Sequence, residues 1–135
     1  MRLTLYTDYA LRVLTYLGAH DGRLCSVSEI AQSYGVSRNH LVKVVHDLGR
    51  AGFIDSVRGR SGGLKLARPA EEIGVGEVVR HAEGGFALVD CGHCPIASCC
   101  RLTGIFGEAM GAFIAVLDRY RLSDLVARPA ELSAL

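Results

Sequence analysis

The sequence lacks a long uncharged apolar segment. Asp8 and Arg12 interrupt the first apolar stretch, so it has neither the pattern of a signal peptide nor the length of a membrane span, which takes about 18 or more apolar residues. We therefore expect a cytoplasmic protein with no membrane partner. In a reducing cytoplasm, clustered cysteines are more often ligands than disulfides.

The chain also lacks the signatures of two enzyme classes. It shows no long alternation of strand and helix patterns, which a thiol-disulfide oxidoreductase needs around its reactive cysteines. Its glycine-rich segment, residues 58–63, lacks the Gly-Lys-Ser/Thr ending of a nucleotide-binding loop, and no helix pattern opens behind it. We expect no enzymatic activity.

A large net charge is missing as well, but the charges are unevenly placed. The formal net charge of the 135 residues is +1. Residues 1–70 hold ten Lys and Arg against five Asp and Glu, whereas residues 71–135 hold five against nine. The length suits one domain with a real core. The basic first half suggests a polyanionic partner, and the acidic second half suggests a separate task.

Cysteine, in contrast, is concentrated in one place. Four of the five cysteines, Cys91, Cys94, Cys99 and Cys100, lie within ten residues, with His93 among them and a helical pattern directly behind. Thiolate is the soft ligand that selects iron-sulfur clusters, zinc or Cu(I). A short polar loop is where several thiolates can converge, so we interpret this stretch as a metal or cluster loop.

Three alternatives compete with that interpretation. The tetrad Cys-Gly-His-Cys looks like a redox motif, but the strand-helix context is missing. A structural zinc could use Cys91, Cys94, Cys100 and His93, although zinc ligand pairs usually lie a dozen or more residues apart. Disulfides are the weakest alternative, because the vicinal Cys99 and Cys100 cannot easily bridge each other.

Upstream, the apolar pattern predicts a first helix over residues 6–17, ended by Gly18 and the turn that follows. Ser26 and Glu29 form a capping box before a second helix that Gly35 stops. Ser37 is placed to cap a third helix with a core stripe from Leu41 to Leu48. A short helix, a tight turn and an amphipathic helix predict a helix-turn-helix over about residues 26–51.

The polar residues of this segment suit DNA. The start of a recognition helix meets base edges, where Arg reads guanine and Asn reads adenine, while Ser and Lys suit phosphates. Two β-prone runs around a cationic glycine-rich tip predict a wing over about residues 53–68, which can reach an adjacent groove. The predicted DNA-binding residues are Ser37, Arg38, Asn39, His40, Lys43, Arg58 and Arg60.

After the wing, the pattern predicts a short helix over residues 75–82, the cysteine loop, and a long helix over about residues 101–120. The long helix has a wider apolar surface than one small domain needs, and Gly104, Gly107 and Gly111 permit close approach. We therefore expect a homodimer through this helix, in keeping with an inverted-repeat operator.

The predicted fold class is mainly α with a small β-hairpin: a winged helix-turn-helix domain plus a long C-terminal dimerisation helix. The expected boundaries are a DNA-binding domain at 1–84, a cysteine-rich cluster loop at 85–100, and a dimerisation helix with its tail at 101–135. Cys25, isolated before the capping box, is expected to be a small buried residue.

With these elements in this order, nearly the whole chain resembles the iron-sulfur branch of a bacterial winged helix-turn-helix regulator family, that of the NsrR-type nitric-oxide-sensing repressors, IscR and RirA. The matching segments are Met1-Arg2-Leu3-Thr4, Thr7-Asp8-Tyr9-Ala10-Leu11-Arg12, Gly35-Val36-Ser37-Arg38-Asn39-His40-Leu41-Val42-Lys43, Val57-Arg58-Gly59-Arg60-Ser61-Gly62-Gly63-Leu64, Leu88-Val89-Asp90-Cys91, Cys94-Pro95 and Cys100-Arg101-Leu102.

The resemblance implies that Cys91, Cys94 and Cys100 hold an iron-sulfur cluster, with [4Fe-4S] favoured and [2Fe-2S] possible. It further implies that Asp8 of the partner subunit completes the ligand set, that Arg12 lies close by, and that nitric oxide destroys the cluster and releases operator DNA. A regulator of iron or iron-sulfur status on the same scaffold is the alternative.

One departure from the family pattern concerns the loop. The family usually has four or five residues between its first two cysteines, and this chain has only Gly92 and His93. His93 therefore remains a substitute ligand, and Cys99 competes with Cys100.

Overall fold

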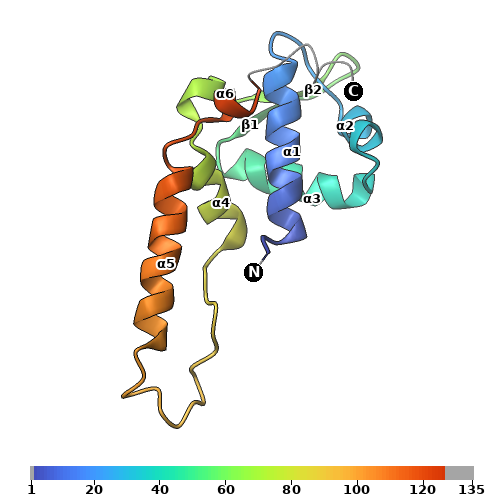
Figure 1. The fold of residues 1–135 in the computed structure, drawn as a ribbon. Coiled ribbons are helices and arrows are strands. Elements are labelled where there is room, and N and C mark those ends of the chain that lie inside the picture. Colours follow the sequence, from blue (N-terminus) through green and yellow to red (C-terminus); the bar gives the residue numbers. More distant parts are fainter. Residues whose placement is uncertain (1, 127–135) are drawn as a thin grey trace.

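A computed structural model describes residues 2–126, which form a mainly helical fold with one two-stranded hairpin (Figure 1). This confirms the predicted fold class. In chain order the elements are α1 (Leu5–Ala19), α2 (Val27–Tyr34), α3 (Arg38–Arg50), β1 (Ile54–Val57), β2 (Gly63–Leu66), the 3-10 turn η1 (Ala70–Glu72), α4 (Val75–Glu83), α5 (Leu102–Leu117) and α6 (Leu122–Leu125).

Helix α1 is the centre of the core. Its predicted apolar face is buried at Ala10, Val13, Leu14 and Leu17, and the helix packs against α3, α4, α6 and β2. Burying each side chain the size of Leu stabilises the fold by roughly 1.5 to 3 kcal/mol. The helix extends past Gly18, where the sequence pattern predicted its end, to Ala19. A Cβ added at Gly18 would lie 3.2 Å from the Val126 side chain, so the absence of a side chain lets Val126 pack closely here.

The helix-turn-helix forms as predicted from α2 and α3. The Ser26 hydroxyl accepts the Glu29 amide at 3.1 Å, and the Glu29 carboxylate accepts the Ser26 amide at 2.9 Å. Gly35 ends α2 in the left-handed region, with φ 61°, which glycine adopts without strain. Ser37 occupies the N-cap of α3, as predicted, but its side chain makes no cap hydrogen bond. The start of α3 is exposed, and water can satisfy its amides.

The predicted wing is the antiparallel hairpin β1-β2, with Ile54 opposite Leu66 and Val57 opposite Gly63. Cys25 is fully buried, as predicted. It also pairs with Leu64 through two backbone hydrogen bonds of 3.0 and 2.8 Å, which attach the hairpin to the segment before α2. A side chain at Gly63 would place its Cβ 3.0 Å from the Cys25 carbonyl oxygen, so a larger residue would have to push this junction apart by a few tenths of an ångström.

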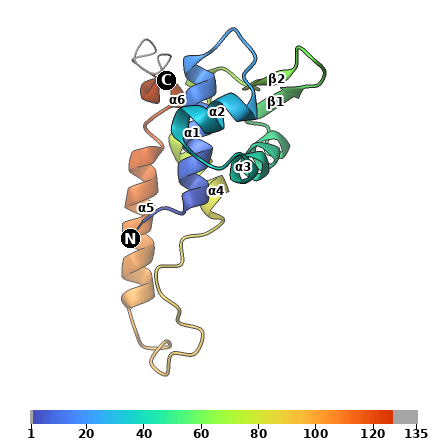
Figure 2. The same ribbon diagram turned by 90° about the vertical axis from the view of Figure 1, so that its right-hand side faces the viewer.

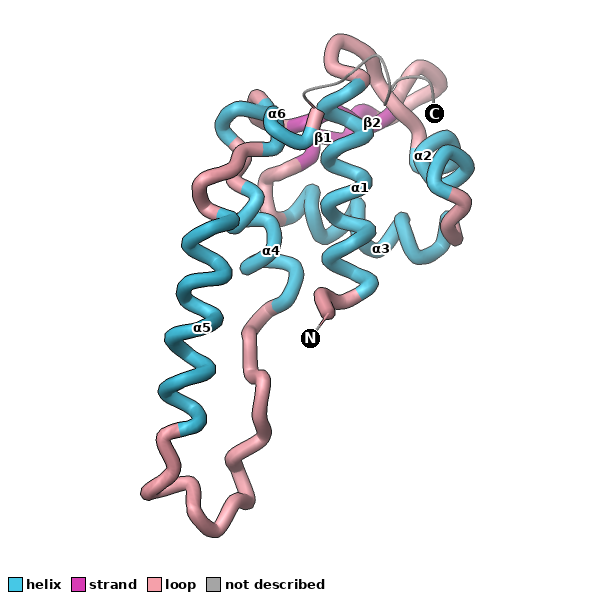
Figure 3. The backbone as a smooth tube through the Cα atoms, viewed as in Figure 1, coloured by secondary structure: helices cyan, strands magenta, loops and turns pink. Residues whose placement is uncertain are grey.

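Helix α4 runs to Glu83, close to the predicted end at residue 82, with Gly84 as its C-cap, and residues 85–101 form the loop that leads to α5. In Figure 1 this loop projects below the N-terminal end of α5, away from the other helices, and Figure 3 shows it without helix or strand. Helix α5 ends at Leu117, before the predicted end near residue 120. None of the helices within residues 2–126 is long and apolar enough to cross a membrane.

The chain after α5 returns to the first domain. Leu122 is buried in the core around α1, and its amide donates to the Ile73 carbonyl at 2.8 Å. Leu122, expected to belong to the tail of the dimerisation helix, therefore contributes to the core of the winged helix-turn-helix. The remainder of the expected tail, 127–135, lies outside the described residues.

Candidate functional site

Helix α3 and the hairpin share one exposed surface, with the hairpin beside α3 in Figure 2. A groove of about 610 Å³ separates them. Arg50 and His46 line it from α3, and Arg58 lines it from the hairpin, together with one carboxylate, that of Asp55. The groove therefore combines a helix face and a cationic hairpin, which suits the phosphate edge of a duplex.

The structure brings the predicted α3 residues to the surface. Ser37, Arg38, Asn39, His40 and Lys43 are all exposed. The Arg38 Nε donates to the Ser28 hydroxyl of α2 at 3.0 Å, which holds the guanidinium against the preceding helix.

His40 faces α1, on the same side of α3 as Lys43. Its ring stacks on that of Tyr9, with centroids 6.4 Å apart, and both line a hollow between α1 and α3. His40 is therefore engaged with α1.

His46 and Arg50 of α3 were not among the residues predicted from the sequence to bind DNA. Asn39, Lys43, His46 and Arg50 follow the i, i+4, i+7, i+11 spacing of one helix face, and all four are exposed. The residues predicted to bind DNA covered only the first two turns of the helix. Extending that spacing to the end of α3 would have found His46 and Arg50.

On the hairpin, Arg58 and Arg60 are both exposed, but only Arg58 lines the groove. Arg60 lies further along the tip, in the turn after Gly59, whose φ of 111° favours glycine. The two arginines therefore have different positions relative to α3.

The second candidate site is the cysteine loop, whose thiols are all free. Cys91 Sγ lies 3.3 Å from the Thr103 hydroxyl, and Cys100 Sγ accepts the Leu102 amide at 3.4 Å. Both thiols thus contact the first turn of α5. Cys99 turns the other way, toward the Ile96 carbonyl at 3.4 Å.

Within residues 2–126 no three side chains of His, Cys, Asp or Glu converge on one point. Cys94 and His93 are exposed, so the loop would have to close around a bound group. The donor set nevertheless fits an iron-sulfur cluster, because several free thiols share one loop and an amide already donates to one sulfur.

Asp8 and Arg12 pair with each other on α1, with Arg12 Nε 2.9 Å from Asp8 Oδ2 and both side chains 42% exposed. The Arg12 guanidinium also lies 5.6 Å from the centroid of the Tyr34 ring in α2. Arg12 therefore links the predicted cluster ligand to the helix-turn-helix.

Helix α5 exposes an apolar face. Met110 is the one buried residue among its described positions, whereas Ile105 is 57% exposed, Val116 45% and Leu102 43%. A contiguous exposed face of this kind marks an interaction surface.

Comparison with known proteins fits this geometry. Residues 3–128 match the model of the Rrf2 family, described as iron-dependent transcriptional regulators. The chain is 43% identical to the HTH-type transcriptional regulator NsrR of Bacillus subtilis, with 100% of this chain and 97% of that protein covered. It is 42% identical to the NsrR of Bacillus licheniformis, covering 93% and 92%.

Among solved structures, the chain is similar to CymR, the global cysteine regulator of B. subtilis. The TM-score is 0.78 at 27% identity, and 94% of this chain and 97% of that chain are covered. These relatives are transcriptional regulators and not enzymes, which removes the thiol-disulfide alternative. The chain therefore belongs to the Rrf2 family of DNA-binding transcriptional regulators.

Proposed function

We propose that the chain is a cytoplasmic, dimeric repressor whose operator affinity depends on an iron-sulfur cluster in the loop at 85–100, with nitric oxide as the signal. The observation that carries the proposal is the set of free thiols gathered at the start of α5, in a chain 43% identical to an NsrR regulator.

For DNA, α3 enters the major groove and the hairpin reaches an adjacent groove. Asn39 and Arg38 read base edges, the latter after it leaves Ser28. Lys43, Arg58 and Arg60 contact phosphates, and Ser37 can do so as well. His40 contributes by positioning α3 against Tyr9.

For assembly, the exposed face of α5 packs against the same face of a second copy. On another side of α5, Gly104, Gly107 and Gly111 have nothing within 4 Å of a built Cβ, so a helix can also approach closely there. A two-fold dimer matches an inverted repeat whose half-sites lie roughly 34 Å apart.

For the cofactor, Cys91, Cys94 and Cys100 hold the cluster and Asp8 of the partner subunit completes it, with [4Fe-4S] favoured over [2Fe-2S]. Arg12, which pairs with Asp8 in the single chain, lies beside the ligand. A cluster with three thiolates and one hard oxygen ligand has an exchangeable iron site that is open to a small diatomic molecule. Cys99 and His93 are the substitute ligands.

A regulator of iron or iron-sulfur status is the second candidate, favoured by the description of the matched family as iron-dependent. The two candidates share residues and differ in the signal. Release of DNA by an iron chelator alone, with no response to nitric oxide, would favour this second function.

Anaerobic purification followed by an absorption spectrum, with iron and sulfide analysis, tests the cofactor. We expect iron and inorganic sulfide bound together to the dimer. A colourless protein that contains zinc would contradict the proposal.

A further inference from the structure

The last turn of α4 contacts three different parts of the fold through neighbouring side chains. Arg80 forms two hydrogen bonds with Asp118, at the end of α5, of 3.0 and 2.7 Å. His81 contacts Asp47 of α3, and Glu83 accepts hydrogen bonds from the start of α1. Gly84 follows immediately, and the cysteine loop begins there. Figure 1 shows α4 between α5 and α3.

Glu83 ties the beginning of the loop to α1. Its Oε1 accepts the Thr4 amide at 2.8 Å, the Thr4 hydroxyl at 3.0 Å and the Thr7 hydroxyl at 2.5 Å. Burial alone would raise the pKa of Glu83, but these hydrogen bonds outweigh it and hold the pKa below its ordinary value. The carboxylate is therefore ionised at neutral pH and fixes the end of α4.

His81 connects the same turn to the recognition helix. Its Nε2 lies 2.9 Å from Asp47 Oδ2, and its ring is tilted against that of buried Phe53, with centroids 5.7 Å apart. Phe53 precedes β1, so the His81 ring is held at the junction between α3 and the hairpin.

Asp47 receives a second donor from α1, the hydroxyl of Tyr6. The hydrogen bond from Tyr6, opposed by burial and assisted by His81, holds the pKa of Asp47 below its ordinary value. An ionised carboxylate only accepts hydrogen bonds, so Nε2 of His81 carries the proton. Asp47 thus joins α1, α3 and α4 at one point.

Asp47 lies on α3 close to the residues proposed to bind DNA, so the contact between His81 and Asp47 can affect DNA binding. Asp47 lies one turn after Lys43 and one turn before Arg50, which are on the exposed face of the same helix. A helix moves as a unit, so a displacement at Asp47 shifts the residues proposed to meet DNA. Of Arg80, His81 and Glu83, only His81 contacts α3.

We propose that His81 is a positioning residue that transmits the state of the cysteine loop to α3 through Asp47. The inference rests on the proposed function, because it assigns a route to the coupling between loop and DNA. Closing of the loop displaces the end of α4, from which it extends, and the His81-Asp47 contact carries that displacement to the recognition helix. A partly exposed ion pair changes an equilibrium constant by at most about fivefold. The contact between His81 and Asp47 is therefore weak enough to change when the loop moves.

Tyr6→Phe separates coupling from simple support. Tyr6 donates to the same carboxylate from α1, which meets the loop only through the Glu83 side chain, whereas the loop continues directly from the α4 turn that carries His81. Tyr6→Phe should lower operator affinity of the cluster-bound and cluster-free forms by the same factor. Removal of His81 should change the ratio between the two forms.

The test uses the full-length protein under anaerobic conditions and an inverted-repeat DNA fragment selected for binding to the wild type. Operator affinity is measured for cluster-bound and cluster-free protein, with iron content and dimer size checked for each variant. The wild-type ratio should be at least about tenfold, and His81→Leu should lower that ratio by about three- to fivefold. His81→Ala removes the same contact with less bulk and should give the same result if His81→Leu folds poorly.

Two controls sharpen the result. His81→Gln keeps an N–H that can reach Asp47 and should retain the wild-type ratio. Arg23→Gln removes an ion pair of comparable exposure, that with Glu29, far from α4, and should leave the ratio unchanged.

The outcomes are distinguishable. Equal affinity of the two wild-type forms would overturn the proposed function and this inference with it. A wild-type ratio that persists in both His81→Leu and His81→Ala would overturn the inference alone. An equal loss in Arg23→Gln would also overturn it, because the effect would then be one of general stability.

Discussion

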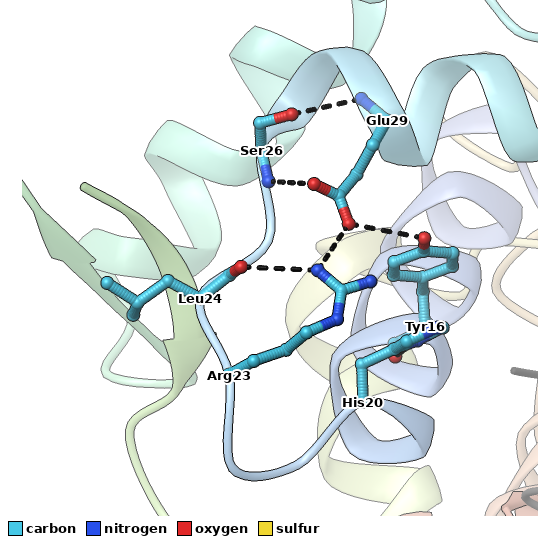
Figure 4. Close-up of polar contacts among 6 residues, drawn as sticks. All are labelled: Tyr16, His20, Arg23, Leu24, Ser26 and Glu29. Atoms are coloured by element: carbon cyan, nitrogen blue, oxygen red, sulfur yellow. Dashed lines mark hydrogen bonds and ion pairs between the residues drawn. The ribbon is translucent and has the colours of Figure 1, made fainter. Parts of the chain in front are cut away.

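Glu29 shows how much a single side chain can hold together in this fold (Figure 4). Its carboxylate accepts the Ser26 amide at 2.9 Å, the Arg23 guanidinium at 2.7 Å and the Tyr16 hydroxyl at 3.3 Å. These partners come from the start of α2, the preceding loop and α1. Glu29 therefore attaches the helix-turn-helix to the central helix.

Replacement of Glu29 should make the fold less stable and less sensitive to acid. Burial alone would raise the pKa of Glu29, but the Ser26 amide and Arg23 outweigh it, so the pKa lies below the ordinary value of 4.5. The stabilisation is thus complete above about pH 4.5 and is lost as the pH falls through the lowered pKa. Glu29→Gln should lower Tm at pH 7 and flatten its decline between about pH 6 and 3.

Thermal unfolding at several pH values measures this effect. Gln can still accept the Ser26 amide, so the variant loses mainly the partly exposed ion pair with Arg23, worth up to about 1 kcal/mol. Glu71→Gln, at an exposed position in η1, is the matched control and should leave the decline unchanged. A Glu29→Gln variant with the wild-type acid profile would show that the network does not stabilise the fold.

The vicinal cysteines should differ in cluster binding. Cys100 Sγ accepts the Leu102 amide and Cys91 Sγ contacts the Thr103 hydroxyl, both in the first turn of α5, whereas Cys99 Sγ donates to the Ile96 carbonyl. Cys100→Ser should abolish cluster incorporation, and Cys99→Ser should leave most of it. Iron and sulfide content after anaerobic reconstitution gives the answer, and the reverse pattern would reassign the ligand.

At the scale of elements, the hairpin and α3 should contribute to DNA binding in different ways. Arg58 and Arg60 are exposed on the hairpin, where they add positive charge near the groove beside α3. Asn39 and Arg38 can instead form bidentate contacts worth about 1 to 3 kcal/mol of base discrimination each. The division separates electrostatic attraction from sequence readout.

Replacing Arg58 or Arg60 with Ala should therefore weaken binding to all DNA sequences alike. The slope of log affinity against log salt should fall by up to about one unit for each phosphate that the variant no longer neutralises. Fluorescence anisotropy at several salt concentrations, with specific and scrambled DNA, measures both properties. A changed sequence preference with an unchanged salt slope would make that arginine a base reader.

Helix α5 should lose its partner when a charge enters its exposed face. Ile105 is 57% exposed in the single chain, so Ile105→Glu should disturb the protomer little and dissociate the dimer. Analytical ultracentrifugation should show a monomer. Val57→Glu, at a 43% exposed position on the hairpin, should remain dimeric. A dimeric Ile105→Glu variant would place the interface elsewhere.

At the scale of the whole molecule, the features that could be predicted from the sequence are local. The capping box at Ser26, the turn at Gly35 and the apolar stripe of α3 depend on neighbours within a few residues, and the structure has them in place. The exposed polar start of α3 follows from the same periodicity.

Long-range contacts could not be predicted, because no periodic pattern reports them. The Cys25-Leu64 pairing, the return of Leu122 to the core and the contacts of His81 with Asp47 join residues distant in sequence. Each depends on where whole elements pack. The fold class was therefore accessible from the sequence, whereas the contacts between α4 and its neighbours needed the structure.

The cysteine loop and the DNA-binding surface are expected to be coupled through the fold. An anaerobic gel-shift titration of the cluster-bound dimer with nitric oxide, on its selected inverted-repeat DNA, tests this coupling most directly. We predict that nitric oxide lowers operator affinity by at least about tenfold, or 1.4 kcal/mol, and that Asp8→Ala makes the cluster more labile. Equal operator affinity of cluster-bound, nitric-oxide-treated and cluster-free protein would contradict the account.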